Sequence, residues 1–363
     1  MAHPLFDDFR QIVLQRRSLI DVRAPVEFAK GAFPNAVNLP LMDDEERRLV
    51  GIRYKEKGNA EAVELGHRLV SGEVKKKRVQ AWCDFIDTHP DALLYCFRGG
   101  QRSQISQQWI DEAGYEIARL RGGYKAFRRY LIEETERAVG RFEPVVLGGR
   151  TGSGKTILLR ELDNTIDLEG LANHRGSSFG RKITPQPSQI DFENALAYEL
   201  VTKLEAGYRR LVFEDEGRNV GRVYLPDLLA EFLGNAPLVV LETPMSRRVE
   251  ITFEEYVTQA QNDYRKMGFP EPLQAWKADI QSAIDRIYRR LGGKRHAIVS
   301  EMLELAFSEQ SRTGEREAHK TWVEYLLREY YDPMYDYQIE KRAERVIFRG
   351  DADEVEAFLK QRA

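Results

Sequence analysis

The sequence predicts an α/β protein of two domains, and three observations support that prediction. Its 363 residues suffice for two or three domains of ordinary size, and a hydrophobic content of 42% suffices for their cores. Short apolar runs alternate with helical patterns in two separate blocks of the chain. In each block one apolar run leads through a glycine-containing loop into a helix, a pattern typical of anion binding. We therefore expect domains at residues 1–138 and 139–363.

The first block starts with a short buried strand at residues 18–24, followed by a helix and a turn-rich return. Residues 43–90 are strongly charged and helical in pattern, and we expect them to form an inserted helical pair with Asn59 as an N-cap. The later elements expected in this block are a strand at 92–95, a loop from Cys96, a helix over 106–115 and a helix over 125–139.

The second block starts at Pro144, which opens a new strand and marks the domain boundary. Its expected elements are strands at 145–147, 211–213, 238–241 and 345–350, a helical, aromatic and Arg-rich extension from about 246 to 337, and a last helix over 351–361.

The composition excludes several classes of protein. The 55 Lys and Arg residues nearly balance the 58 Asp and Glu residues, which argues against a protein that coats nucleic acid without specificity. Two cysteines cannot form a disulfide framework or a four-thiolate zinc site. The chain has no run of about 18 apolar residues and no apolar signal core at its N-terminus, so we expect no membrane partner and a cytoplasmic location.

Residues 149–156, GRTGSGKT, match the phosphate-loop pattern G-x-x-x-x-G-K-[ST] between a strand and a helix. Glycines let backbone N–H groups turn toward phosphate oxygens, the lysine adds a positive charge and the hydroxyl can hold Mg²⁺. Such a loop recognises a diphosphate or triphosphate rather than a base, so any diphosphate ester could fit. The predicted phosphate-binding residues are Gly149, Gly152, Ser153, Gly154, Lys155, Thr156 and Asp215. Thr156 and Asp215, or a neighbour of Asp215, are the candidate Mg²⁺ ligands.

Cys96 stands at the end of an apolar strand and is followed by FRGGQRS and a helix. Loop N–H groups, the helix N-terminus, Arg98 and Arg102 would favour a thiolate there. Such a thiolate can attack an electrophilic sulfur, selenium or phosphorus atom, so Cys96, Arg98 and Arg102 are the predicted catalytic residues. Cys83, by contrast, lies on an apolar helical face and is expected to be a buried core thiol.

The loop YCFRGGQRS resembles the active loop of the rhodanese family. DVRAPVEFAKGAFPNAVNLP resembles the segment that flanks the active site in that family. The resemblance implies a rhodanese-like N-terminal domain with a helical insertion, joined to a P-loop NTPase-like domain with a helical, Arg-rich extension. The loop from Cys96 to Arg102 spans seven residues, as in dual-specificity phosphatases, whereas rhodaneses commonly have six. Loop length therefore leaves phosphatase chemistry open.

Five segments in order resemble the family of tRNA 2-selenouridine synthases over essentially the full length: YCFRGGQRS, GGRTGSGKT, DLEGLANHRGSSFG, QPSQIDFENALA and FEDEGRNVGR. The resemblance implies a transferase that replaces sulfur by selenium in 2-thiouridine at the tRNA wobble position. It implies selenophosphate and geranyl diphosphate as co-substrates, an S-geranylated intermediate, and no tightly bound cofactor beyond a candidate Mg²⁺. A selenophosphate-producing enzyme is a candidate partner.

The same resemblance implies roles for individual residues. Cys96 would accept selenium from selenophosphate as a perselenide, while Arg98 and Arg102 bind the phosphate part. The P-loop would hold the diphosphate of geranyl diphosphate, with Lys155 stabilising the departing pyrophosphate. Candidate substrate-binding residues beside it are His174, Arg175, Ser177 and Ser178. tRNA would contact the Arg and aromatic residues of the C-terminal helices, including Arg247 and Arg248.

Two other classes of protein remain open on the sequence. One is a P-loop ATPase or kinase with a rhodanese module for sulfur transfer or regulation, which rapid ATP turnover without prenyl diphosphate would favour. The other is a non-catalytic tRNA-binding redox sensor, in which alkylation of Cys96 would leave function intact.

Overall fold

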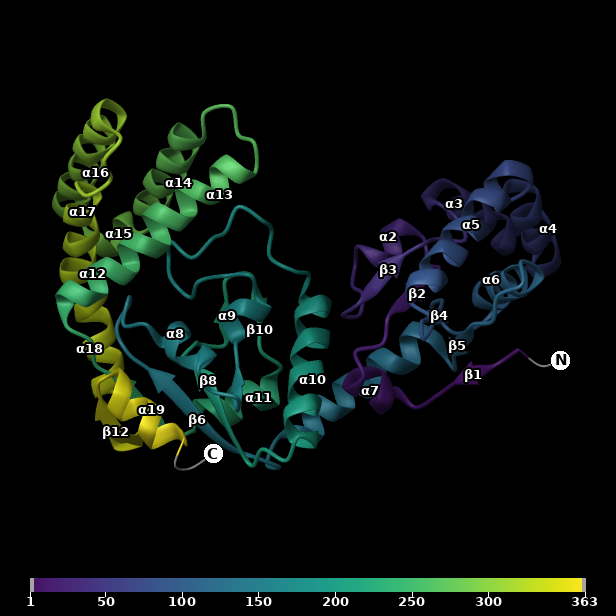
Figure 1. Ribbon diagram of the computed structural model, residues 1–363, viewed down its shortest axis with the longest axis horizontal. Helices are drawn as coiled ribbons and strands as arrows, with labels where there is room; N and C mark the ends of the chain where they lie inside the picture. Colours follow the sequence, from purple (N-terminus) through teal and green to yellow (C-terminus); the bar gives the residue numbers. More distant parts are fainter. Residues whose placement is uncertain (1–2, 361–363) are drawn as a thin grey trace. The chain divides into compact units, whose positions relative to one another are not determined.

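The computed structural model describes residues 3–360 and confirms a mixed α/β fold with two parallel sheets (Figure 1). The chain divides into two compact units: unit 1 runs up to Ala138 and includes Ser188–Ala206, and unit 2 comprises the remainder. The expected domains were 1–138 and 139–363, whereas in the structure residues 188–206 belong to unit 1. The helix α10 (Gln189–Glu205) packs instead against α7 (Gly123–Ala138) because its apolar face completes the core of unit 1.

The sheet of unit 1 has the strand order β1-β5-β4-β2-β3, with every pair parallel. Its strands are β1 (Leu5–Phe6), β2 (Leu19–Asp21), β3 (Ala36–Asn38), β4 (Leu93–Tyr95) and β5 (Ala118–Leu120). Successive side chains of β4 point to opposite faces: Leu93 joins the core under α1 (Phe9–Leu14), α7 and α10, and Leu94 joins the core under α5 (Gly72–Thr88) and α6 (Gln101–Glu112). Cys96 therefore emerges at the carboxyl edge of a sheet buried on both faces.

The helical insertion has three helices, where a pair was expected. They are α3 (Asp44–Lys57), α4 (Asn59–Leu69) and α5. Gly58, at a φ of 83°, separates the first two, and Val70 and Ser71 separate the last two, with Gly72 as the first residue of α5. Gly58 rather than Asn59 is the N-cap of α4, so the expected cap is one residue displaced.

The sheet of unit 2 has the strand order β12-β11-β6-β8-β7, again entirely parallel. Its strands are β6 (Glu143–Gly148), β7 (Thr165–Ile166), β8 (Arg210–Glu214), β11 (Leu238–Leu241) and β12 (Val346–Gly350). These bounds confirm the four expected strands of this block. A short antiparallel ribbon, β9 (Asn219–Val220) and β10 (Val223–Tyr224), was not predicted because two-residue strands have no periodicity. The helices α8 (Lys155–Arg160), α9 (Leu168–Leu171), α11 (Asp227–Gly234) and α19 (Ala352–Lys360) belong to the same unit as this sheet, whereas the short helix α2 (Pro25–Phe28) belongs to unit 1.

The helical extension is present and has its own core around Trp276, Ile284 and Trp322. It comprises α12 (Met245–Phe253), η1 (Glu254–Gln259), α13 (Ala260–Lys266), α14 (Pro272–Arg286), α15 (Tyr288–Leu291), α16 (Gly293–Thr313), α17 (His319–Leu326), η2 (Leu327–Tyr331), α18 (Asp332–Glu340) and η3 (Ala343–Arg345). The π-helical turn η1 continues α12 and faces the phosphate loop, a common position for such turns at functional sites. The expected last helix ends at Lys360 in the structure, and residue 361 lies outside the described residues. No helix among residues 3–360 is both long and apolar enough to span a membrane.

Candidate active sites

The phosphate loop runs from the end of β6 to the start of α8, as expected. Gly152 has a φ of 75°, and a Cβ there would lie 2.3 Å from the Thr252 hydroxyl and 2.9 Å from the Arg248 carbonyl oxygen. Only glycine fits this close approach between the loop and α12. The buried Arg248 guanidinium donates to the Thr151 carbonyl and pairs with Asp332, so it supports the loop and is not exposed for tRNA.

Donor groups gather inside this loop, and two of them have no hydrogen-bond partner among residues 3–360. The hydroxyls of Thr151 and Ser153 are buried and make no hydrogen bond within the described part of the chain. Lys155 folds back, and its Nζ donates to the Gly149 carbonyl at 3.0 Å. Buried polar groups are nearly always satisfied, so these donors fit an anion in the loop.

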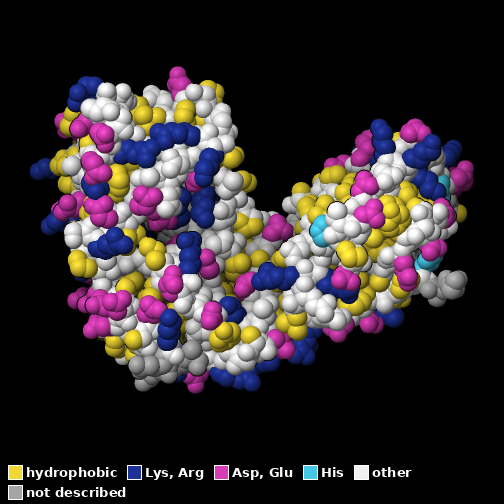
Figure 2. Space-filling model, in the orientation of Figure 1, with side chains coloured by type: hydrophobic (Ala, Val, Ile, Leu, Met, Phe, Trp, Pro, Cys, Tyr) yellow, Lys and Arg dark blue, Asp and Glu magenta, His cyan; other side chains and the backbone are white. Residues whose placement is uncertain are grey.

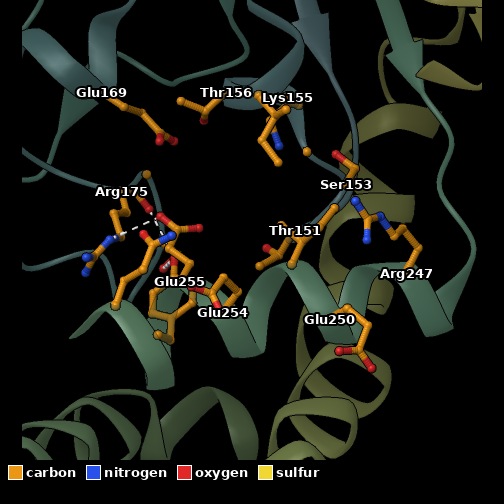
Figure 3. A pocket seen from close by; sticks show the side chains of 18 of the residues that line it. Thr151, Ser153, Lys155, Thr156, Glu169, Arg175, Arg247, Glu250, Glu254 and Glu255 are labelled. Carbon is orange, nitrogen blue, oxygen red and sulfur yellow. Dashed lines mark hydrogen bonds and ion pairs between the residues drawn. The ribbon is translucent and has the colours of Figure 1, made fainter. Parts of the chain in front are cut away.

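A cavity of about 420 Å³ opens in front of the loop and is lined by residues from β6–α8, the segment after α9, and α12–η1 (Figure 3). Its cations are Lys155, Arg160, Arg175 and Arg247, and its carboxylates are Glu169, Glu216, Glu250, Glu254 and Glu255. Ile157, Ile251, Tyr256 and Tyr335 provide apolar wall. This volume lies within the range of small-molecule binding sites.

A buried carboxylate lies beside the phosphate loop at the end of β8. The Thr156 hydroxyl donates to Glu214 Oε1 at 3.4 Å, and the Glu169 N–H donates to Glu214 Oε2 at 2.8 Å. Burial first, and the nearby Glu169 carboxylate second, raise the pKa of Glu214 to about 8 and that of Glu216 to about 9. Buried carboxyl groups this close together are stabilised when they bind a proton or a cation.

The candidate Mg²⁺ ligands change in the structure. The Asp215 carboxylate is engaged by Arg342 at 2.6 and 2.7 Å and does not line the cavity, so it is not placed to hold an ion beside Thr156. Glu214, its neighbour, takes that position because alternate side chains of a strand point to opposite faces. Thr156 and Glu214 are hard oxygen ligands of the kind Mg²⁺ prefers. No cluster of three or more metal-ligating side chains occurs among residues 3–360, so phosphate oxygens and water would complete the coordination.

The four candidate residues after α9 do not act as one group. Arg175 and Ser177 line the cavity, and Arg175 Nε lies 3.1 Å from Glu255 Oε1. His174 is buried outside the cavity, and burial together with nearby cations lowers its pKa. Ser178 is also outside the lining, and its carbonyl accepts from Arg286. Sequence reasoning missed Glu169 and Glu255, although Glu169 lies within the DLEGLANHRG segment.

The Cys96 loop is held against a second glycine turn. The Tyr124 N–H donates to the Cys96 carbonyl at 2.8 Å, and a Cβ on Gly123 would lie 2.3 Å from the same oxygen. A Cβ on Gly99, which has a φ of 66°, would lie 2.9 Å from the Gly122 nitrogen. The Gly122–Gly123 pair therefore sets the shape of the thiol loop.

The thiol itself is buried at the base of this loop. Cys96 is 3% exposed, and its Sγ lies 3.2 Å from the Ser103 hydroxyl on α6. Helix α6 begins at Gln101, earlier than expected, so Arg102 lies in its first turn. The Arg102 guanidinium pairs with Glu27 at 2.5 and 3.2 Å, while Arg98 is exposed.

The Asp-Val-Arg strand end has a structural role. Asp21 and Arg23 form a buried ion pair, in which the Arg23 Nη2 also donates to the Gly31 carbonyl at 2.8 Å. The Arg23 guanidinium lies 3.9 Å from the centre of the Tyr124 ring. Cys83 is a buried free thiol on α5, as expected, and burial raises its pKa.

The fold and the two loops define a protein with a rhodanese-like domain followed by a P-loop domain. The model of the rhodanese-like domain family matches residues 6–130, and that of the tRNA 2-selenouridine synthase AAA domain matches residues 142–363. The chain belongs to the tRNA 2-selenouridine synthase family, a family of enzymes.

Several curated relatives are similar over the whole chain. The tRNA 2-selenouridine synthase of Sulfurovum sp. (strain NBC37-1) is 65% identical over 99% of this chain and 98% of its own length. That of Hydrogenovibrio crunogenus (strain DSM 25203 / XCL-2) is 52% identical over 99% of both chains. That of Cupriavidus pinatubonensis (strain JMP 134 / LMG 1197) is 51% identical over 98% of both. The resemblance found in the sequence is thus confirmed.

Proposed function

We propose that this enzyme converts 2-thiouridine of tRNA to 2-selenouridine in two steps, by S-geranylation at the P-loop and selenium transfer at Cys96. The different chemical groups of the two sites support this division into two steps. The P-loop cavity has anion-binding groups but no thiol in its wall, whereas the Cys96 loop offers a nucleophile. The first site suits departure of a diphosphate and the second suits attack on selenium.

In the first step the sulfur of 2-thiouridine attacks C1 of geranyl diphosphate. The C1–O bond breaks, pyrophosphate leaves with the electron pair, and the base loses its N3 proton. Lys155 and the loop N–H groups stabilise the negative charge of the departing pyrophosphate. Ile157 and Ile251 offer apolar contacts to the geranyl group. Mg²⁺ held by Thr156 and Glu214 would supply further charge stabilisation.

In the second step the Cys96 thiolate attacks the selenium of selenophosphate, and the Se–P electron pair leaves with phosphorus as phosphite. The perselenide then attacks C2 of the base and expels geranylthiolate. A low-molecular-weight thiol attacks the Cys96 sulfur and releases selenouridine, and a second thiol restores Cys96 with formation of a disulfide. Direct attack of selenophosphate on C2 would instead yield phosphate, so the phosphorus product distinguishes the two routes.

The experiment is nucleoside mass spectrometry of thiolated tRNA incubated with the protein, geranyl diphosphate, selenophosphate and a thiol, with each omitted in turn. We expect geranylated base to precede selenated base. Cys96→Ser should stop selenation and leave geranylation unchanged. Lys155→Ala should stop geranylation, but it should still selenate S-geranyl tRNA when that substrate is supplied. Cys83→Ser is the matched control for the thiol. Full selenation by Cys96→Ser would remove Cys96 from the reaction.

A further inference from the structure

A second cavity lies in unit 1, between the helical insertion and α6. It measures about 150 Å³ and is lined almost wholly by apolar groups. Its apolar wall includes Leu41, Met42, Val50, Ala62, Val63 and Trp109. Figure 2 shows that hydrophobic side chains also gather on the visible surface of this unit.

The wall of this cavity is preformed. Leu41, Ala62 and Trp109 are each less than 9% exposed, while Tyr54 at the rim is 57% exposed. A cavity of about 150 Å³ has room for a molecule of about the size of benzene. Its size therefore matches about one isoprene unit of a prenyl chain, with the remaining carbons at the rim.

Helix α6 connects this cavity to the reactive thiol. Ser103, in the first turn, touches Cys96 Sγ, and its neighbour Arg102 lines the cavity. Ile105 and Trp109 follow Arg102 along the same helix face at spacings of three and four residues. When the perselenide on Cys96 attacks C2 of the base, the group that leaves C2 is therefore close to this apolar wall.

The charges of this cavity discriminate between possible prenyl ligands. Arg102 is a cation in its wall, and Glu27 already engages that guanidinium through two hydrogen bonds. Asn59, His67 and Gln101 also line the cavity, but Arg102 is the Lys or Arg residue of its lining, whereas the P-loop cavity offers Lys155 and a glycine turn to a diphosphate.

We propose that this cavity binds the geranyl chain of S-geranyl-2-thiouridine during selenium transfer. This inference rests on the proposed function, because it places the product of the first step at the second site. Binding of the geranyl chain would hold C2 of the base near Cys96. It would also keep unmodified 2-thiouridine from competing for the selenium-transfer site. The helical insertion would thereby supply the substrate selectivity of the rhodanese-like unit.

The binding test uses the full chain with two nucleosides, S-geranyl- and S-methyl-2-thiouridine. Wild type should bind the geranyl nucleoside about tenfold or more tightly than the methyl one, because each buried methylene contributes severalfold in affinity. Val63→Asp, which puts a carboxylate into the half-buried wall on α4, should abolish that preference. Val74→Asp is the matched control, since Val74 is 40% exposed on α5 and does not line the cavity.

Val63→Phe provides a second variant that fills the cavity without adding charge, in case Val63→Asp does not fold. Equal affinity of the geranyl nucleoside for wild type, Val63→Phe and Val63→Asp would overturn the proposal. That result would mean that the cavity is empty or covered by another copy of the chain.

A kinetic test separates this inference from the proposed function. An anticodon stem-loop carrying S-geranyl-2-thiouridine should be selenated about tenfold more slowly by Val63→Asp than by wild type, while geranylation of the thiolated stem-loop stays unchanged. If wild type fails to selenate the geranylated RNA, the proposed function is wrong, and the binding preference alone then decides the role of the cavity.

Discussion

The guanidinium of Arg342 forms two hydrogen bonds with the Asp215 carboxylate, at 2.6 and 2.7 Å. Asp215 follows β8 beside the phosphate loop, and Arg342 follows α18 at the end of the helical extension. The pair therefore ties the extension to the sheet that supports the loop. It also leaves Glu214 as the acidic group nearest Thr156.

Arg342→Met should destabilise unit 2, because it leaves a largely buried carboxylate without its partner. We expect a loss of about 2 kcal/mol in the free energy of unfolding, measured by urea denaturation. Arg218→Met removes an ion pair with Asp227 whose side chains are 61% and 78% exposed, and should change stability by less than about 0.5 kcal/mol. Equal effects of the two variants would show that the Arg342 pair has no structural role.

Glu214→Gln should raise the Mg²⁺ concentration needed for geranylation by about tenfold, because it removes a carboxyl oxygen ligand beside Thr156. Asp215→Asn should leave that Mg²⁺ dependence unchanged, since Asp215 lies outside the cavity. The measurement is the initial rate of geranylation across a Mg²⁺ titration. If Asp215→Asn alone shifted the Mg²⁺ dependence, Asp215 and not Glu214 would be the Mg²⁺ ligand.

Gly123→Ala should stop selenation and leave geranylation intact, because its Cβ would collide with the Cys96 carbonyl at a φ of 60°. A destabilisation of about 2 kcal/mol or more is expected from the strain and the collision. Gly140→Ala is the control, since Gly140 also has a positive φ, 83°, but a Cβ there meets open space. Wild-type selenation by Gly123→Ala would contradict the glycine contact.

Stability should fall on acidification because of His319. The Trp322 N–H donates to His319 Nδ1 at 2.9 Å, so the buried ring is neutral and Nε2–H donates to Gln310. Burial lowers the pKa of His319 to about 4. A lowered pKa in the folded state gives stability that is present above about pH 6.5 and is lost as the pH falls toward 4.

The loss over this window should be on the order of 3 kcal/mol for wild type. Urea denaturation between pH 7 and 4 measures it, and His319→Gln should show a correspondingly flatter pH dependence. Parallel curves for the two proteins would assign the acid sensitivity to other groups.

Local sequence patterns were sufficient for the phosphate loop, the thiol loop and the central strands beside them, but strands β1, β3 and β5 of unit 1 were not predicted. Each depends on neighbouring residues: an apolar run, glycines at fixed spacing, and a following helix. The P-loop lysine and hydroxyl and the buried state of Cys83 were predictable for the same reason. The three-helix insertion was predicted as a pair because glycine breaks at Gly58 and Gly72 are weak signals within a charged, helical stretch.

Tertiary structure decided which side chains meet. Whether Glu214 or Asp215 faces Thr156 depends on the direction of alternate side chains at a strand end, and on Arg342 from 127 positions further along the chain. The placement of α10 in unit 1 likewise depends on contacts with α7 that no local pattern encodes. The sequence by itself thus determined both chemical loops, because backbone conformation is local. The partners around each loop, including the apolar cavity beside Cys96, arise only when distant segments pack together.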